Sequence, residues 1–216
     1  REHTLAAAPV DVYKNAPADG NYKLVWDIEE HQSGKVWIAC QAGRLMIYDQ
    51  KKSETNYLTP PIFNEKTVRQ VKQDREGNLW FATQNGQLVK WTNSGSLADG
   101  YREVKQFGAI ISKLYFDQSG MLWVATHGRG VFQLNPGTGQ VIKQFGADKS
   151  LAAHSENIED ILQLNDSLFC FAGDLLNIWN VKNGRISKTI SNNNEPLHGV
   201  YAVQTERLKA KCRRRM

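Results

Sequence analysis

Short apolar stretches recur along the chain, and each is followed by a turn and a second stretch in which apolar and polar residues partly alternate. The clearest copy is DREGNLWFATQNGQLVKW, residues 74–91, in which residues 79–82 are apolar. So short an apolar run between turn-forming Asp, Asn and Gly is typical of a strand buried on both faces. The pattern therefore predicts a β-hairpin.

The hairpin recurs before and after this copy. HQSGKVWIACQAGRLMIYD precedes it, and DQSGMLWVATHGRGVFQLN and a looser NDSLFCFAGDLLNIWN follow it. The anchor aromatics lie 43, 43 and 46 residues apart, and we expect them to fill equivalent buried sites: Trp37, Trp80, Trp123 and Phe169. A repeat of about 40–45 residues holds a four-stranded sheet and is typical of a propeller blade.

Weaker apolar segments around each hairpin supply the remaining strands. First strands are expected at residues 23–30, 67–74, 111–117 and 158–164, and outer strands near 55–58, 102–107, 141–145 and 186–190. Helical solenoids have similar repeat lengths, but the amphipathic runs of about 10–15 residues that they need are missing. The sequence predicts an all-β fold, a β-propeller with about four complete blades at residues 22–61, 66–107, 110–146 and 157–191.

The motif D-x-x-G-x-L-W-x-(A/G)-T-x-x-G, once in each blade, resembles the two-component regulator propeller repeat, found in periplasmic sensor regions of hybrid two-component systems from Bacteroidetes. The resemblance covers about residues 10–205 and is close in the second and third copies. It departs at His31 in the Asp position, at Cys40 in the Thr position, and at Asn165-Asp166-Ser167, which replaces the longer glycine turn. The resemblance implies a periplasmic, non-catalytic sensor of glycan breakdown products.

The two ends of the chain do not match complete blades. We expect a partial propeller over residues 1–206 with stray strands at 10–14 and 199–205, and a basic tail outside the propeller at 207–216. Stacked repeats bury their apolar faces only against neighbours. Further blades, other sensor domains or a second copy are therefore expected to cover the open faces of a fragment of a larger propeller. The alternative is a small five-bladed ring closed by the two stray strands.

The net charge of +5 comes from the tail rather than from the propeller. Six of the 27 Lys and Arg residues lie at positions 207–215, which leaves 21 in the propeller against 22 Asp and Glu. A basic stripe that could bind nucleic acid is absent from it, so we expect no nucleic-acid partner. No apolar run approaches the length of about 18 residues that a membrane span requires. Cys40 and Cys170 are expected as buried free thiols, and Cys212 lies in the tail.

No catalytic residues, metal ligands or cofactor site are expected. The five histidines form no H-x-H or H-x-x-x-H pair, and the sequence holds no nucleophile elbow, P-loop or dinucleotide-binding turn. We interpret the acidic pairs Glu29-Glu30 and Glu159-Asp160 as solvated or channel-facing. A glycan-active propeller enzyme is a distant third possibility.

Binding residues are expected on one face of the propeller. In an up-and-down blade, the turn from second to third strand and the joint to the next blade emerge on the same side, and such loops on a rigid scaffold often carry binding residues. The ligand-binding residues predicted there are Asn85, His127, Arg129, His154, Asn157 and Lys66. Amides and a few charges suit an oligosaccharide ligand. The alternatives are a protein-interaction propeller without a small ligand, and side chains that are merely exposed.

Overall fold

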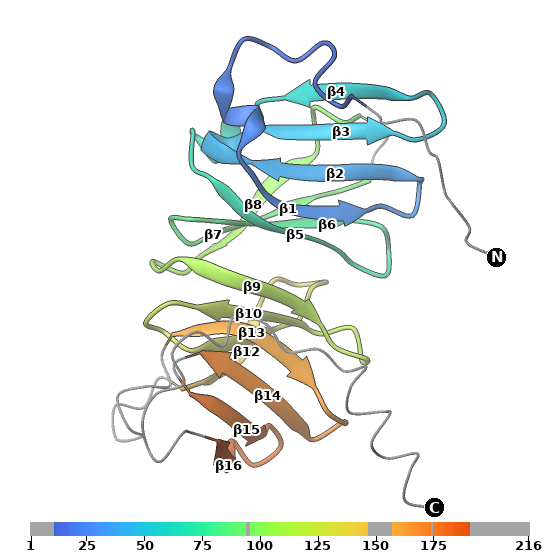
Figure 1. Cartoon of the computed structure of the whole chain (residues 1–216). Helices are drawn as coiled ribbons and strands as arrows, with labels where there is room; N and C mark the ends of the chain where they lie inside the picture. The colour runs from blue at the N-terminus through green and yellow to red at the C-terminus, as the bar shows by residue number, and fades with distance from the viewer. Residues whose placement is uncertain (1–10, 94–95, 147–156, 174, 191–216) are drawn as a thin grey trace, which may run out of the picture.

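The computed structural model describes residues 11–93, 96–146, 157–173 and 175–190, and within these ranges it contains strands, turns and short 3-10 helices but no α-helix (Figure 1). Four antiparallel sheets of four strands each follow one another in the order β1-β2-β3-β4, β5-β6-β7-β8, β9-β10-β11-β12 and β13-β14-β15-β16. Each sheet coincides with one predicted repeat and is called blade 1 to blade 4. The predicted fold class is confirmed.

The strand bounds match the apolar stretches of the sequence. They are β1 (Val25–Glu30), β2 (Lys35–Cys40), β3 (Leu45–Asp49), β4 (Glu54–Leu58), β5 (Val68–Gln73), β6 (Leu79–Thr83), β7 (Gln87–Trp91), β8 (Tyr101–Gln106), β9 (Ile111–Phe116), β10 (Leu122–Thr126), β11 (Val131–Leu134), β12 (Val141–Phe145), β13 (Ile158–Gln163), β14 (Leu168–Gly173), β15 (Leu176–Asn180) and β16 (Arg185–Ile190). The 3-10 helices are η1 (Gly20–Lys23), η2 (Gln41–Gly43) and η3 (Pro61–Phe63).

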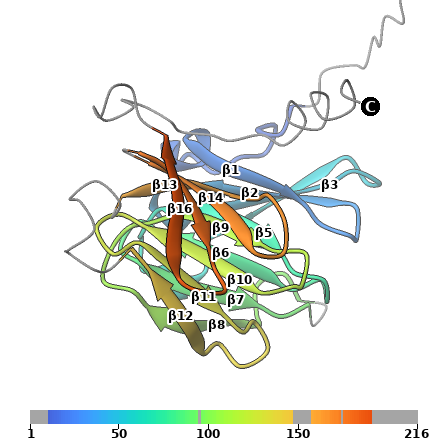
Figure 2. The ribbon, with the colours of Figure 1, turned by 90° about the horizontal axis from the view of Figure 1, so that it is seen from below.

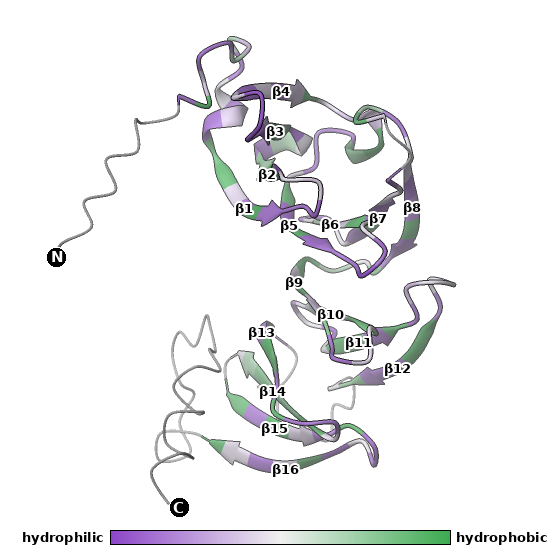
Figure 3. Cartoon of the chain, turned by 90° about the vertical axis from the view of Figure 1, so that its right-hand side faces the viewer, coloured by the Kyte–Doolittle hydropathy of each residue, from purple (hydrophilic) through white to green (hydrophobic). Residues whose placement is uncertain are grey.

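The blades form an arc with their first strands on its inner side (Figure 3). Strand β1 contacts β5, β5 contacts β9, and β9 contacts β13, so the inner surface is continuous along the described residues. The outer strands β8 and β12 lie on the far side of the molecule from β1 and β13 (Figure 2). This arrangement leaves one edge of each first strand facing the inside of the arc.

Apolar cores lie between neighbouring blades rather than inside one blade. Trp37 of blade 1 packs against Val71 and Phe81 of blade 2, and the same type of contact recurs between blades 2 and 3 and between blades 3 and 4. The three tryptophans Trp37, Trp80 and Trp123 are at most 1% exposed. Burying an aromatic side chain of this size is among the largest single contributions to packing. These three anchors are confirmed as equivalent buried sites.

The prediction for the fourth anchor was wrong, because Phe169 is not at the position equivalent to Trp37, Trp80 and Trp123. The turn before β14 closes with a bond from Leu164 N–H to the carbonyl of Leu168, as Asp74 N–H bonds to Asn78 before β6. Counting from that turn, Cys170 corresponds to Trp80, and the sequence alignment was one residue out. Since a one-residue shift moves a side chain to the other face of a sheet, Phe169 faces back and stacks on Trp123 with ring centroids 4.4 Å apart.

The Asp of the motif has two roles in the structure. Asp74 Oδ1 accepts bonds from the N–H groups of Glu76 and Asn78 in the turn, and Asp74 Oδ2 accepts the indole N–H of Trp80 at 2.9 Å. Asp117 and Trp123 repeat this bond at 2.8 Å in blade 3. A single carboxylate therefore fixes the turn and satisfies the buried indole.

Blade 1 lacks that carboxylate. His31 stands in its place and bonds instead to Ser33 Oγ at 2.7 Å and to the carbonyl of Gly77, in the next blade, at 2.8 Å. The indole nitrogen of Trp37 is left without a hydrogen-bond partner. The predicted change of turn chemistry at His31 thus exchanges a contact within the blade for a contact between blades.

The N-terminal segment also differs from the prediction. Residues 11–14 form a turn and not a stray strand, because the Asp11 carboxylate accepts the N–H of Tyr13 and the Asp11 carbonyl accepts the N–H of Lys14. Tyr13 and the buried Tyr22 pack against the outer face of blade 1, beside Met46. The second stray strand at 199–205, the tail at 207–216 and Cys212 lie outside the described residues.

Both described cysteines are free and buried, as predicted. Burial raises the pKa of the Cys40 thiol to about 12 and that of Cys170 to about 11. A thiol in this range stays protonated at neutral pH and is a poor nucleophile. Both residues therefore act as small core side chains.

Candidate functional site

The turns between second and third strands and the joints between blades form one side of the molecule, called the joint face. In blades 1, 2 and 3 this turn is tied to its own blade at the same place: Gln41 N–H bonds to the Leu24 carbonyl at 2.9 Å, Gln84 N–H to Thr67 at 2.8 Å, and His127 N–H to Ile110 at 3.0 Å. These bonds hold the loops against the first strands. The joint face is therefore a rigid platform at the end of the inner surface.

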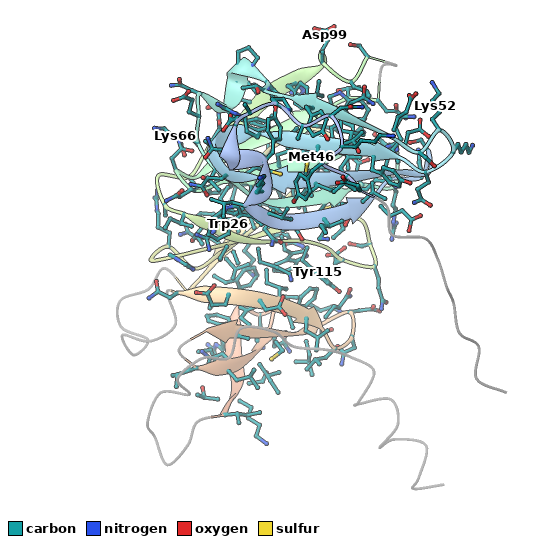
Figure 4. All side chains as sticks on the ribbon, turned by 45° about the horizontal axis from the view of Figure 1, so that its top comes forward. Trp26, Met46, Lys52, Lys66, Asp99 and Tyr115 are labelled. Atoms are coloured by element: carbon teal, nitrogen blue, oxygen red, sulfur yellow. The ribbon has the colours of Figure 1, made fainter. Side chains whose placement is uncertain are left out.

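The predicted site residues are spread over this face. Lys66 and Asn85 are exposed, and Asn85 Oδ1 accepts the hydroxyl of Thr83 at 2.6 Å, which orients its amide within the turn. Asn157 is exposed in the joint before β13. His154 lies outside the described residues. Figure 4 labels Lys66 at the joint-face end of blade 1 and Lys52 at the opposite end.

His127 and Arg129 belong to one turn but point to different neighbours. The Nε2 atom of His127 lies 2.8 Å from Glu159 Oε1 in blade 4, with both side chains partly exposed, although the two groups are not aligned as a hydrogen bond. Arg129 Nη1 donates to the carbonyl of Phe107 in the joint between blades 2 and 3. The structure therefore brings His127 close to the β13 end of the face, and it turns Arg129 toward the other side.

A row of equivalent residues at the edge of the inner surface was missed by the sequence reading. It consists of the second residue of each first strand, and is called the mouth row: Trp26, Arg69, Ser112 and Glu159. Trp26 is 45% exposed. The Arg69 guanidinium lies 4.6 Å from the centre of the Trp26 ring. The indole N–H of Trp26 donates to Gln41 Oε1 at 2.9 Å. The signal in the sequence was a Trp where the other blades have polar residues.

Charged side chains link the blades below the mouth row. Asp27 Oδ2 accepts the N–H of Val71 at 3.0 Å, and Glu29 accepts the N–H of Gln73 at 2.9 Å, so side chains of β1 satisfy the free edge of β5. Glu29 also pairs with Lys72 at 2.6 Å. The carboxylates of β1 thus accept the β5 backbone N–H groups that a neighbouring strand would accept within a blade.

The acidic pairs are expected to be solvated or channel-facing, and Asp160 is channel-facing, since it lines a cleft on the inner surface. This side chain is only 5% exposed, and its carboxylate lies 2.9 Å from Lys113 Nζ. Beside this pair, a cleft of about 390 Å³ is lined by the first strands β5, β9 and β13 and includes Lys72 and Tyr115. Burial raises the pKa of the Tyr115 hydroxyl, with the nearby carboxylates of Asp117 and Asp160 acting in the same direction. The inner surface therefore offers a neutral phenol and paired charges.

Two other features are absent from the part of the chain that the structure describes. No three His, Cys, Asp or Glu side chains gather in a way that could hold a metal ion. No helix in the same ranges has the length and apolar character needed to cross a membrane.

A comparison with protein-family models matches residues 62–85 to the family described as two component regulator propeller. The chain carries a two-component regulator propeller repeat. The match runs from η3 through β5 and β6 to Asn85, and it includes the Asp74 turn and Trp80. The resemblance predicted from the repeats is confirmed, and the matched segment contains the mouth-row residue Arg69.

The fold of this repeat protein is shared with solved structures of little sequence similarity. A chain in the crystal structure of a mitotic checkpoint complex superposes with a TM-score of 0.63 at 12% identity, over 79% of this chain and 53% of that chain. The present chain thus spans about half the length of the chain that it matches, and the likeness shows the fold alone. A search of the curated proteins found no match.

Proposed function

We propose that this propeller segment is the ligand-sensing part of a two-component sensor and that it binds a glycan-derived ligand at the joint face, across the mouth row. A sensing or interaction role follows from the family of the repeat. The glycan and the periplasmic location are the finer parts of the proposal, and they rest on the family resemblance and on the side chains at the mouth row.

The observation that carries the proposal is the environment of Trp26. Its ring is about half exposed, although the other five tryptophans are at most 3% exposed. The bond to Gln41 and the overlying Arg69 hold the ring in one orientation. A fixed, exposed indole offers an apolar face to the C–H side of a sugar ring, and the adjacent amide and guanidinium can bond to hydroxyl groups.

The remaining polar groups extend this platform along the arc. Ser112 and Glu159 continue the mouth row, His127 lies beside Glu159, and Asn157 is two residues before Glu159 in the chain. A ligand that contacts both Trp26 and this second group has to span blades 1 to 4. An oligosaccharide has the necessary length and hydroxyl content, whereas a monosaccharide would occupy one end.

The test is a calorimetric or array screen of oligosaccharides against the wild type and two variants. Trp26→Ala should weaken binding at least about tenfold, as expected for an aromatic binding anchor. Ile142→Ala, at a site 57% exposed on the outer strand β12, is the matched control and should bind like wild type. If no oligosaccharide binds, or if both variants bind equally, the glycan proposal is refuted.

A protein-interaction role is the second candidate, and the exposed apolar residues of the β1 region favour it. Leu24 and Ile28 are 57% and 56% exposed, yet the residues equivalent to Ile28 in the other blades, Val71, Leu114 and Ile161, are buried. A blade of the larger sensor or a second copy could cover this strip. Loss of self-association in Ile28→Glu by analytical ultracentrifugation, together with a negative glycan screen, would favour this candidate.

No catalytic step is part of the proposal. A glycan-active enzyme stays the third possibility, and incubation of the same oligosaccharides with the protein tests it, because hydrolysis would release new reducing ends. The periplasmic location can be tested by fractionation of the native host cells with an antibody against this segment.

A further inference from the structure

The side of the molecule opposite the joint face contains two clefts that are built alike but filled differently. The first lies between blades 2 and 3, has a volume of about 170 Å³, and includes Asp74 and Lys90. The second lies between blades 3 and 4, has a volume of about 430 Å³, and includes the equivalent Asp117. The smaller cleft contains an ammonium group at its buried carboxylate, and the larger cleft has none there among the described residues.

In the smaller cleft the protein supplies its own ammonium group. Lys90 is buried, with only 8% of its side chain exposed, and its Nζ atom lies 3.4 Å from Asp74 Oδ2 and 4.9 Å from the centre of the Trp80 ring. The amide of Asn78 also donates to Asp74 Oδ2, at 3.0 Å. Asp74 is therefore a buried carboxylate whose outer oxygen has three neighbouring donors.

In the larger cleft the equivalent carboxylate, Asp117, lacks two of these three donors, the counterparts of Lys90 and Asn78. Asp117 Oδ2 accepts the indole N–H of Trp123, as Asp74 does from Trp80. Gln133 pairs with Trp123 in the register in which Lys90 pairs with Trp80, so a shorter neutral side chain replaces the lysine. Met121, which has no side-chain donor, stands in the position of Asn78.

The surroundings of Asp117 are acidic and open. Asp166 is exposed on the same cleft, and no Lys, Arg or His is among the described residues that line it. The cleft is wider partly because Gln163 takes the place that Phe116 has against Trp80 in the other interface. Lys143, which pairs with Gln133 across β11 and β12, lies at the edge of this cleft, and its ammonium donates to the carbonyl of the lining residue Val181 at 2.7 Å and not to Asp117.

We infer that the cleft between blades 3 and 4 binds a primary ammonium group, which takes the position at Asp117 that Lys90 occupies at Asp74. A buried carboxylate with a free lone pair on Oδ2 gains a charge-assisted hydrogen bond from such a group. Gln133 offers an amide oxygen to its remaining N–H donors, and Gln163 Oε1, which already accepts the N–H of Gln118 at 2.8 Å, has a second lone pair. The ammonium can belong to a small amine or to a lysine side chain of another polypeptide, and the site is separate from the mouth row.

The indole N–H of Trp123 reports directly on this site, because it is bonded to the same oxygen. In nitrogen-15 spectra of the whole chain, n-butylammonium chloride should shift the Trp123 indole resonance with a saturable dependence on concentration, beyond the effect of equal sodium chloride. The resonance is assigned by its loss in Trp123→Phe. An unmoved resonance, or the same shift with sodium chloride, would overturn the inference.

Gln133→Lys is the decisive variant, since it rebuilds the Lys90 arrangement with the chain's own side chain. It should weaken the response to n-butylammonium at least about tenfold, which is the usual effect of a hydrogen bond to a charged group. Gln140→Lys, with the same charge change at an exposed turn position outside the cleft, should respond like wild type. A Gln133→Lys variant that responds as the wild type does would also refute the site.

The source of the ammonium is resolved by a second titration. Tighter binding of Nα-acetyl-lysine N-methylamide than of n-butylammonium would assign the site to a lysine of a partner polypeptide, and equal affinities would assign it to a small amine. Trp26→Ala should leave both titrations unchanged, so failure of the proposed glycan function does not affect this result.

Discussion

Asp74→Asn tests the role of the motif carboxylate most directly, because the substitution keeps the shape of the side chain and removes its charge. The amide oxygen can still accept the turn N–H groups, but the amide nitrogen faces the indole N–H of Trp80 and the ammonium of Lys90. Trp80 and Lys90 would then keep buried donors without an acceptor. Breaking a buried, hydrogen-bonded pair costs about 3–5 kcal/mol, so we expect a loss of about 3 kcal/mol or more in the free energy of unfolding at pH 7.

The loss should also depend on pH. Burial opposes ionisation of Asp74, but hydrogen bonds from Trp80 and Asn78 and the charge of Lys90 outweigh it and hold the pKa below its ordinary value of 3.8. For a carboxylate with a lowered pKa, the stabilisation is present above the pKa of the unfolded chain and is lost as pH falls through the pKa of the folded state. The difference between wild type and Asp74→Asn should therefore shrink below about pH 4.

Urea denaturation at a series of pH values, followed by tryptophan fluorescence, measures this difference. Asp166→Asn, at an exposed position, is the matched control and should change stability by less than about 0.5 kcal/mol. A similarly small change in Asp74→Asn at pH 7, or a difference that stays constant down to pH 3, would refute the role given to this carboxylate.

Three further substitutions probe other parts of the structure. Trp80→Ala should lower the free energy of unfolding by about 3–5 kcal/mol in urea denaturation, because it removes a fully buried aromatic, and a stable variant would contradict the blade core. His31→Asp should give the Trp37 indole an acceptor, so hydrogen exchange at that indole should slow; unchanged exchange would show that the position is not equivalent to Asp74. Arg129→Ala should weaken ligand binding in calorimetry by about 1–3 kcal/mol with little effect on stability, and equal affinities would remove this turn from the site.

The sequence was sufficient for the parts of the fold that depend on local pattern. The apolar second strands, the turn at Asp74 and the blade interval follow from residue type and spacing alone. The register of the fourth blade did not, since Phe169 looks like a tryptophan substitute in sequence, and only the bond between Leu164 and Leu168 shows that Cys170 takes that position. The strand predicted at residues 11–14 was also wrong, because the Asp11 side chain forms an Asx turn despite the strand-like pattern of these residues.

The sequence was sufficient to predict which face of the molecule carries the candidate site, but not which residues contact one another there. Topology places the turns and joints on one side, and Asn85, His127 and Arg129 are found there. Trp26 was not selected, because its exposure and its contact with Arg69 depend on how blade 2 lies against blade 1. Contacts between blades join residues that are more than 40 positions apart, as in the bond between Asp27 and Val71, and no local pattern encodes them.

The side-chain bridges between first strands have a consequence for how such a gene can change. Glu29 of blade 1 needs Lys72 of blade 2, and Asp160 of blade 4 needs Lys113 of blade 3. Unequal crossing-over between repeats deletes, duplicates or reorders them. A recombinant that placed blade 1 directly before blade 4 would set Glu29 opposite Leu162, so that Glu29 would lose its ammonium partner. The stability of the chain therefore depends on the order of its blades, because placing blade 1 directly before blade 4 would break both bridges.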